Sequence, residues 1–280
     1  MSMTRRGVVA ALGTVAAGAA RAQAPAGRVF DCHLHIIDPR YPLVENQGYL
    51  PPPLTWPEYE TQARPLGITG GAVVSGSFHG FDQSYLRAVL GALGPEWVGV
   101  TQVPNDIPDE AMADLARARV RALRFNVFRG RIDSVDDIVA TATRAHAAAG
   151  WHPEIYADAA ALAPHADKLA KLPSPIVIDH LGMTERGLPV VLDLVAAGAK
   201  VKATGFGRVD MNVPRVLEAI AARDPSALMF GTDIPSTRAR RPFEVADLEL
   251  VRRVLGAELA ERVLWRNGAE KYRIGQAGRA

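Results

Sequence analysis

The sequence has only one cysteine, Cys32, so it can form no disulfide within a single chain. Its 32 basic and 30 acidic side chains nearly cancel, which removes the electrostatic reason to expect nucleic acid or an anionic membrane as a partner. It also lacks a stretch rich in proline and serine that would separate two domains. A 280-residue chain without these features must be stabilised by one sizeable apolar core.

No apolar run in the chain reaches the ~20 residues that a membrane-spanning helix needs. The run of small and apolar residues over 8–20 follows two adjacent arginines and precedes the patterns ARA and AQA, which end at Ala22 and Ala24. This layout is typical of a signal peptide of the twin-arginine type, cleaved after one of those alanines. An alanine-rich tail and a membrane anchor are the alternatives. We expect residues 1–24 to direct export to the periplasm or the medium, and 25–280 to form the mature domain, with no membrane attachment.

After this segment, short apolar runs rich in β-branched residues alternate with longer amphipathic runs. Eight such strand–helix units predict a (β/α)8 TIM barrel in a single domain. An open, doubly wound sheet is the alternative, but no GxGxxG follows the first strand, which weakens a dinucleotide-binding version. The expected strands are Val29–His35, Gly71–Ser75, Trp97–Val103, Ala122–Val127, His152–Tyr156, Ile176–His180, Lys200–Thr204 and Leu228–Thr232. The expected helices are Trp56–Arg64, Gln83–Leu93, Asp109–Arg119, Val135–Ala149, Ala159–Leu172, Leu188–Ala197, Val213–Arg223, Phe243–Leu255 and Ala257–Trp265.

The active site of such a barrel lies where the strands end and the following loops begin. His33 and His35 end the first expected strand, and residues two apart in a strand face the same side. His180 ends the sixth strand and Asp233 follows the eighth. These four residues come together only in a barrel, and we predict that they are catalytic. Three other histidines lie away from the predicted mouth and are expected to be structural; they are His146, His152 and His165.

Other polar side chains near the strand ends are candidates for binding a substrate. Arg124 lies in an apolar strand, where an unpaired charge is costly. It therefore either pairs with an acid of the protein or awaits an anionic substrate, and the second hypothesis is favoured. The proline-rich loop 37–55 has the length of a lid. The expected substrate-binding residues are Arg124, Arg129, Arg131, Tyr156, Arg208, Ser75, Ser77, His79 and Tyr49.

Six stretches of the chain together resemble the amidohydrolase superfamily: FDCHLHIIDP, SGSFHGFDQSYL, VRALRFNVFRG, VIDHLG, FGTDIP and LWRNGAEKY. The resemblance covers essentially the whole mature chain. It is nearest to the branch that contains 2-pyrone-4,6-dicarboxylate lactonase and related sugar and muconolactone lactonases, which work without a metal. The resemblance implies hydrolysis of a small, carboxylate-bearing lactone.

The resemblance also implies a role for each site residue. Asp233 would be the general base that deprotonates water. The three histidines, His33, His35 and His180, would stabilise the developing oxyanion. The substrate carboxylate would bind Arg124 together with Arg129 or Arg131. A second polar group would bind Arg208 and Tyr156, while Ser75, Ser77 and His79 would line the wall and Tyr49 would close over the site.

The chain departs from the metal-dependent members of the superfamily at two positions. Those members often have a histidine at the end of strand five, where this chain has Tyr156, or a carbamylated lysine on strand four, where it has Arg124 and Asn126. A two-metal site is therefore not expected. Three histidines and Asp233 remain compatible with a single zinc ion. No cofactor is favoured, and a mononuclear metal-dependent amidohydrolase or decarboxylase stays open as an alternative.

A second alternative is a non-catalytic, exported protein that binds small anions. Asp233 argues against this class, because a carboxylate in the pocket would weaken the binding of an anion.

Overall fold

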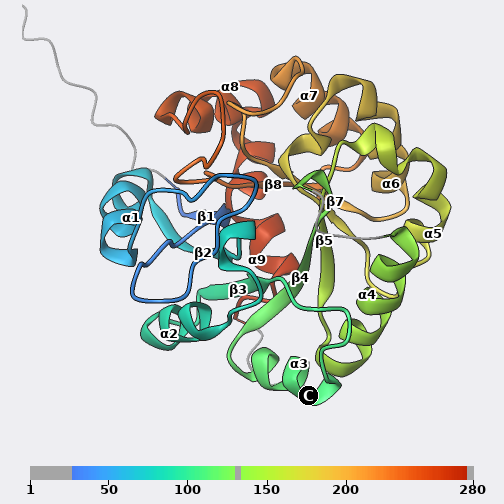
Figure 1. Cartoon of the computed structure of the whole chain (residues 1–280). Helices are drawn as coiled ribbons and strands as arrows, with labels where there is room; N and C mark the ends of the chain where they lie inside the picture. Colours follow the sequence, from blue (N-terminus) through green and yellow to red (C-terminus); the bar gives the residue numbers. More distant parts are fainter. Residues whose placement is uncertain (1–26, 130–133, 276–280) are drawn as a thin grey trace, which may run out of the picture.

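The computed structural model describes residues 27–129 and 134–275, and within them eight parallel strands form one barrel surrounded by helices (Figure 1). Neighbouring strands follow the chain order, and each is parallel to the next. This arrangement confirms the predicted (β/α)8 barrel. The expected signal peptide lies outside the described residues. The strands are β1 (Val29–Leu34), β2 (Ile68–Val74), β3 (Trp97–Thr101), β4 (Val120–Asn126), β5 (His152–Tyr156), β6 (Val177–Ile178), β7 (Lys200–Ala203) and β8 (Leu228–Phe230).

Hydrogen bonds between β1 and the chain after β8 close the barrel. The amide of Asp233 donates to the carbonyl of His33 at 2.7 Å, and the amide of His35 donates to the carbonyl of the residue after Asp233 at 2.9 Å. The buried carboxylate of Asp31 bridges the two segments, because it accepts hydrogen bonds from the amides of His33 and Thr232 at 3.0 and 2.9 Å. Three of the predicted site residues are thus part of the closing seam, and the fold itself brings them together.

Apart from the short helix nearest the carboxyl terminus, the helices cover the outside of the barrel and bury apolar side chains against the strands. In α4 (Val135–Ala149) the side chain of Ser134 caps the amino end, and Gly150 ends the helix with a φ of 64°, a left-handed conformation that glycine adopts readily. Among the described helices, none combines the length and the apolar character needed to cross a bilayer. The other helices are α1 (Trp56–Ala63), α2 (Ser84–Ala92), α3 (Asp109–Arg117), α5 (Ala166–Ala170), α6 (Leu188–Ala196), α7 (Val213–Arg223), α8 (Val245–Glu261) and α9 (Asn267–Lys271).

Most element boundaries agree with the prediction to within a few residues, and β5, α4 and α7 agree residue for residue. The helix expected over Ala159–Leu172 is instead a 3₁₀ segment, Ala159–His165, followed by α5. Pro164 lies inside that segment, and a proline cannot donate the backbone hydrogen bond that an α-helix requires. Strand β6 is shorter than expected, so Asp179 and His180 lie in the turn that follows it.

The two helices expected near the carboxyl terminus are continuous in the structure. Helix α8 runs through a break at Gly256 into a π-helical segment, Arg262–Arg266, and then into α9. Tyr272, which follows α9, is fully buried in the barrel interior, where its ring lies 5.7 Å from that of Phe30. This carboxyl-terminal segment fills the amino end of the barrel (Figure 1), so the interior opens at the end where the strands finish.

Candidate active site

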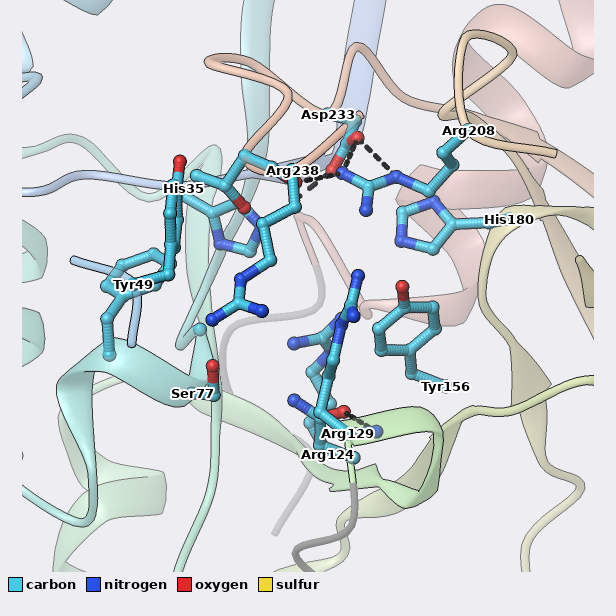
Figure 2. A pocket seen from close by; sticks show the side chains of 14 residues that line it. His35, Tyr49, Ser77, Arg124, Arg129, Tyr156, His180, Arg208, Asp233 and Arg238 are labelled. Carbon is cyan, nitrogen blue, oxygen red and sulfur yellow. Dashed lines mark hydrogen bonds and ion pairs between the residues drawn. The ribbon is translucent and has the colours of Figure 1, made fainter. Parts of the chain in front are cut away.

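A cavity opens at the carboxyl ends of the strands, and polar and charged side chains from several strand ends and loops line it. Figure 2 shows arginine side chains from several elements directed toward the middle of this cavity. Most of the predicted site residues meet here, although Arg131 lies outside the described residues. The predicted residues that line the cavity are His35, Tyr49, Ser77, Arg124, Arg129, Tyr156, His180, Arg208 and Asp233.

Ser75 and His79 do not line the cavity, and the expectation that they form its wall is wrong. The hydroxyl of Ser75 is hydrogen-bonded to that of Tyr85 at 2.8 Å. Both ring nitrogens of His79 bond to main-chain atoms, one to a carbonyl at 2.9 Å and the other to an amide at 3.0 Å, and the ring stacks on Tyr85. These side chains stabilise the turn that carries Ser77. This turn is not a strand, so its side chains do not alternate between the inside and the outside of the barrel, and the sequence could not show which of them face the cavity.

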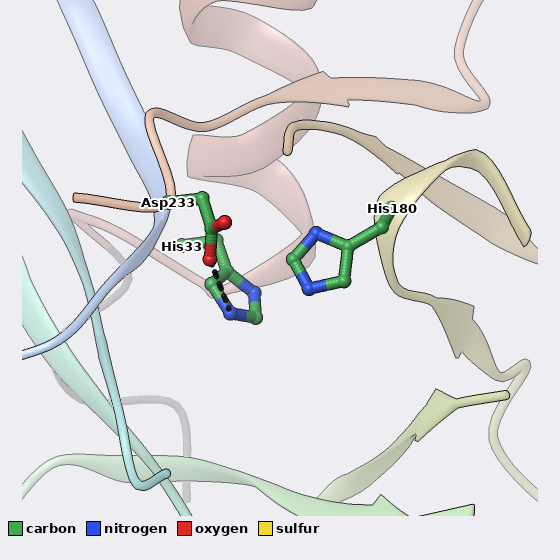
Figure 3. A group of neighbouring side chains, drawn as sticks. All are labelled: His33, His180 and Asp233. Carbon is green, nitrogen blue, oxygen red and sulfur yellow. Dashed lines mark ion pairs between the residues drawn. The ribbon is translucent and has the colours of Figure 1, made fainter. Parts of the chain in front are cut away.

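His33, His180 and Asp233 face one another (Figure 3). His180 and Asp233 line the cavity, whereas His33 is fully buried beside them and does not line it. One nitrogen or oxygen atom from each lies within 4.8 Å of the others. Within the described part of the chain, His33 Nε2, His180 Nδ1 and Asp233 Oδ1 are buried atoms without a hydrogen-bond partner. Asp233 and His180 also have positive φ angles, 61° and 52°, which are uncommon for residues other than glycine and frequent at functional sites. Buried polar atoms are rarely left unpaired, so their convergence marks a place for a ligand.

The two carboxylate oxygens of Asp233 have different environments. Arg208 binds Oδ2 through Nε at 2.9 Å and also through Nη2, and both side chains are buried. Oδ1 lies 3.8 Å from Nε2 of His33 and 3.8 Å from Nε2 of His35. These separations are too long for direct hydrogen bonds, and a water molecule could bridge them. Arg208 therefore pairs with the predicted base. Because Arg208 also lines the cavity, its expected contact with a polar group of the substrate stays a prediction.

Arg124 also has a partner within the protein. Its Nε donates to Asp179 Oδ2 at 2.9 Å, and its Nη1 donates to the carbonyl of Ser75 at 3.3 Å. The favoured hypothesis, that Arg124 stays unpaired until an anion binds, is wrong, and the alternative of an acid partner is confirmed. The guanidinium still lines the cavity, with its carbon 5.2 Å from the centre of the Tyr156 ring.

The three histidines of the mouth are neutral near neutral pH. Burial lowers the pKa of His33, and it lowers the pKa of His35 and of His180 well below the ordinary value. His35 Nδ1 lies 2.7 Å from the carbonyl of Val74, which can only accept, so Nδ1 carries the proton and Nε2 presents a lone pair. Neutral His35 can therefore accept a hydrogen bond from a ligand but cannot donate one. A lone pair at Nε2 does not suit the expected role of His35 as a donor to an oxyanion.

Sequence reasoning missed several residues of the site. Arg238, in the loop after β8, lines the cavity and lies over the ring of Tyr49 at 4.5 Å. Glu154 and Lys202 lie fully buried beneath the mouth, where they form an ion pair. A signal for this pair was present, because each is a charged residue inside a short apolar strand. Arg238 gave no comparable signal, since arginine is common in exposed loops.

The cluster in Figure 3 also has the donor types that a divalent metal ion accepts. Two imidazole nitrogens and one carboxylate oxygen are a usual ligand set for zinc, and their unpartnered atoms fit that role. Two positive charges oppose the binding of any metal ion at this place: Arg208 is paired with Asp233, and Lys202 lies beside His33. His33, His180 and Asp233 are thus the residues that would hold a single ion.

A family model described as Amidohydrolase matches residues 30–274 of the chain. The chain is 31% identical over 162 residues to 2-pyrone-4,6-dicarboxylate hydrolase of Comamonas testosteroni; the match covers 56% of this chain and 52% of the relative, about half of its length. It is 26% identical over 243 residues to D-galactarolactone isomerase of Agrobacterium fabrum, covering 86% of this chain and 75% of the relative.

Among solved structures, a probable 2-pyrone-4,6-dicarboxylic acid hydrolase from Acinetobacter baumannii with citric acid bound superposes with a TM-score of 0.77. The identity is 18%, and the superposition covers 88% of this chain and 99% of that one. At this identity the likeness shows the fold alone.

Proposed function

The chain belongs to the amidohydrolase family, as its sequence resemblance predicts, and from this premise we propose that it hydrolyses a small, carboxylate-bearing lactone. The names of the relatives support this class of substrate, because a pyrone dicarboxylate and a galactarolactone are both lactones that carry carboxylate groups. The single observation that carries the proposal is the unpartnered oxygen of Asp233, which faces His33 and His35 at the base of the cavity.

In the proposed reaction Asp233 acts as the general base. Because Arg208 occupies Oδ2, Oδ1 is the oxygen that takes a proton from water. The lone pair on His35 Nε2 accepts the second water proton as a hydrogen bond and so orients the water. The water oxygen attacks the lactone carbonyl carbon, and a donor such as His33 stabilises the oxyanion. The ring C–O bond then breaks, and the leaving oxygen takes the proton that Asp233 holds and becomes a hydroxyl group. The new carboxyl group loses its proton to solvent, which leaves a carboxylate and restores the Asp233 carboxylate.

The charges around the site support an anionic substrate. At the cavity and directly beneath it, positive side chains outnumber negative ones by two. The positive residues are Arg124, Arg129, Arg208, Arg238 and Lys202, and the negative residues are Glu154, Asp179 and Asp233. Within the described chain, Arg129 and Arg238 have no carboxylate partner, so their guanidinium groups are the ones free to bind substrate carboxylates.

A mononuclear metal hydrolase or decarboxylase is the alternative on the same barrel. His33, His180 and Asp233 would hold the ion, which would supply Lewis-acid polarisation of the carbonyl group. Two features favour the metal-free reaction: Arg208 neutralises the only carboxylate of the set, and Lys202 adds a positive charge beside His33.

The test is turnover of a panel of carboxylated and neutral lactones by protein of known metal content. We expect ring opening of a carboxylated lactone, with kcat lowered about 10²–10⁴-fold in Asp233→Asn, the usual contribution of a general base. Asp193→Asn is the matched control, because Asp193 is exposed on α6. Full activity of Asp233→Asn would remove the general-base role, and a product with a rearranged ring would indicate an isomerase. A stoichiometric metal ion whose removal abolishes turnover would establish the alternative.

Export is a separate proposal that depends on the amino-terminal sequence alone. The paired arginines, the apolar run and the small residues before Ala24 support a periplasmic or secreted location. Cell fractionation of the full-length chain, with and without replacement of both arginines by lysine, tests it. Retention of only the replaced chain in the cytoplasm is the expected result, and export of both chains would contradict the twin-arginine signal.

A further inference from the structure

A buried layer of charged side chains lies directly beneath the three histidines, and the proposed reaction does not use it. Lys202 of β7, Glu154 of β5 and Asp179 after β6 all have side chains with no exposed surface. Lys202 Nζ donates to Glu154 Oε2 and lies 3.4 Å from Asp179 Oδ1. Burying charged groups is costly even when they are paired, so their presence under the site requires a reason beyond stability.

The contact between Lys202 and His33 identifies which ring nitrogen of His33 carries the proton. Lys202 Nζ lies 3.2 Å from His33 Nδ1. An ammonium group donates three hydrogen bonds and accepts none, so the nitrogen that faces it must present a lone pair. A neutral imidazole has one protonated nitrogen, and the proton of His33 is therefore on Nε2, the atom that faces Asp233 Oδ1 at 3.8 Å.

Asp179 is the competing partner for the same atom. Its Oδ1 lies 3.4 Å from His33 Nδ1, so it would accept a hydrogen bond if that nitrogen were protonated. In the described structure this oxygen has no hydrogen-bond partner, while Arg124 occupies the other oxygen at 2.9 Å. Lys202 at 3.2 Å is therefore the hydrogen-bond partner of His33 Nδ1, rather than Asp179 at 3.4 Å.

The surroundings of Lys202 keep it charged and fixed in place. Burial lowers the pKa of Lys202, but Glu154 and Asp179 raise it by more, so it lies above the ordinary value. Glu154 is itself held by the hydroxyl of Tyr272 at 2.5 Å and by His152 Nε2 at 3.2 Å. A continuous polar chain therefore runs from the carboxyl-terminal segment, through Glu154 and Lys202, to His33.

We infer that Lys202 is a positioning residue that holds His33 in the Nε2–H form, opposite to the tautomer of His35. His33 then presents a donor and His35 an acceptor to the same small space, because the carbonyl of Val74 fixes His35 and Lys202 fixes His33. In the proposed lactone hydrolysis, the acceptor His35 orients water and the donor His33 binds the developing oxyanion. Only the effect on turnover rests on that proposed function.

The ¹⁵N chemical shifts of the histidine ring nitrogens test this inference without any substrate, because protonated and lone-pair nitrogens differ strongly. In the unaltered protein we expect His33 to be protonated at Nε2 and His35 at Nδ1. In Lys202→Met, His33 Nδ1 is expected to gain the proton and to donate it to Asp179, while His35 stays unchanged as an internal reference. Lys200→Met is the matched control, because Lys200 lies on the same strand, is partly exposed and bonds to Ser226 instead.

Lys202→Met leaves Glu154 without its charge partner, so the double variant Lys202→Met/Glu154→Gln serves if the single variant does not fold. Where turnover is measurable, either variant should lower kcat about 10²–10³-fold with little change in KM, as expected when one transition-state donor is lost. A proton on His33 Nδ1 in the unaltered protein, or an unchanged His33 tautomer in the variants, would overturn the inference. Absence of lactone turnover would count against the proposed function only, since the tautomer is measured independently.

Discussion

The buried histidines make the folded state sensitive to acid, and the size of the effect follows from their pKa values. Burial lowers the pKa of His79 and of His152 from an ordinary value of 6.5 to about 3 in each case. Below pH 6.5 these two histidines bind protons in the unfolded chain but stay neutral in the folded chain, so the free energy of unfolding decreases as the pH falls from 6.5 toward 3. Burial also raises the pKa of Asp31 from 3.8 to about 6, which acts in the opposite direction because the folded state binds that proton more readily.

The net change in the free energy of unfolding can be calculated for a fall in pH from about 7.5 to about 5.5. His79 and His152 each lower this free energy by about 1.4 kcal/mol, and Asp31 raises it by about 0.8 kcal/mol, so the net loss is about 2 kcal/mol. His33, His35 and His180 also have lowered pKa values and add to the loss. For a domain of this size the melting temperature should fall by roughly 4–8 °C.

Equilibrium urea unfolding at the two pH values, followed by circular dichroism, measures this loss. His79→Gln is the informative variant, because glutamine does not titrate and can donate and accept as the neutral ring does. Its loss between the two pH values should be smaller by about 1.4 kcal/mol than that of the unaltered protein. A free energy of unfolding that is constant, or that rises on acidification, would refute the assignment of these histidines as buried and neutral.

Two further predictions concern substrate charge and packing. Arg129→Gln should raise KM for a carboxylated lactone about 10–100-fold, because a hydrogen bond to a charged group contributes about 1.5–3 kcal/mol. The KM for a neutral lactone should be unaffected. Equal effects on both substrates in steady-state assays would argue against a carboxylate contact. Gly268→Ala should destabilise the fold by about 1–3 kcal/mol, because the added Cβ would lie 2.6 Å from Cys32 Sγ. Gly91→Ala in α2 meets no atom within 4 Å and should stabilise the fold by about 0.5–1 kcal/mol. Melting temperatures that shifted in the same direction in both variants would contradict this packing.

The barrel and its mouth were predictable because periodicity is a local signal. Val29–Leu34 and Val135–Ala149 are strand and helix by their own residues, and the order of the elements then forces the strand ends together. That reasoning places His33, His180 and Asp233 in one cluster without any contact being known.

The pairing of charges inside the mouth was not predictable, because it depends on distances between strands far apart in the sequence. Arg124 and Asp179 are separated by 55 positions and Lys202 and His33 by 169, and no local pattern links them. Arg208 was expected to bind substrate because it follows a strand end, yet its place in the barrel brings it to Asp233. Charged residues within short strands were the available sign that such pairs exist.

The proposed roles of the two histidines in FDCHLHIIDP therefore depend on residues outside that stretch. As isolated side chains, His33 and His35 are equally suited to bind a metal ion, to accept a proton or to donate a hydrogen bond. The carbonyl of Val74 gives His35 a lone pair on the cavity side, and Lys202 gives His33 an N–H there. His33 is one of the residues that would hold a metal ion, and ligation through its Nε2 would need a lone pair there, which the position of Lys202 opposes. Attack by water on a carbonyl group needs acceptors for the two water protons and a donor for the carbonyl oxygen, and Asp233, His35 and His33 supply that set.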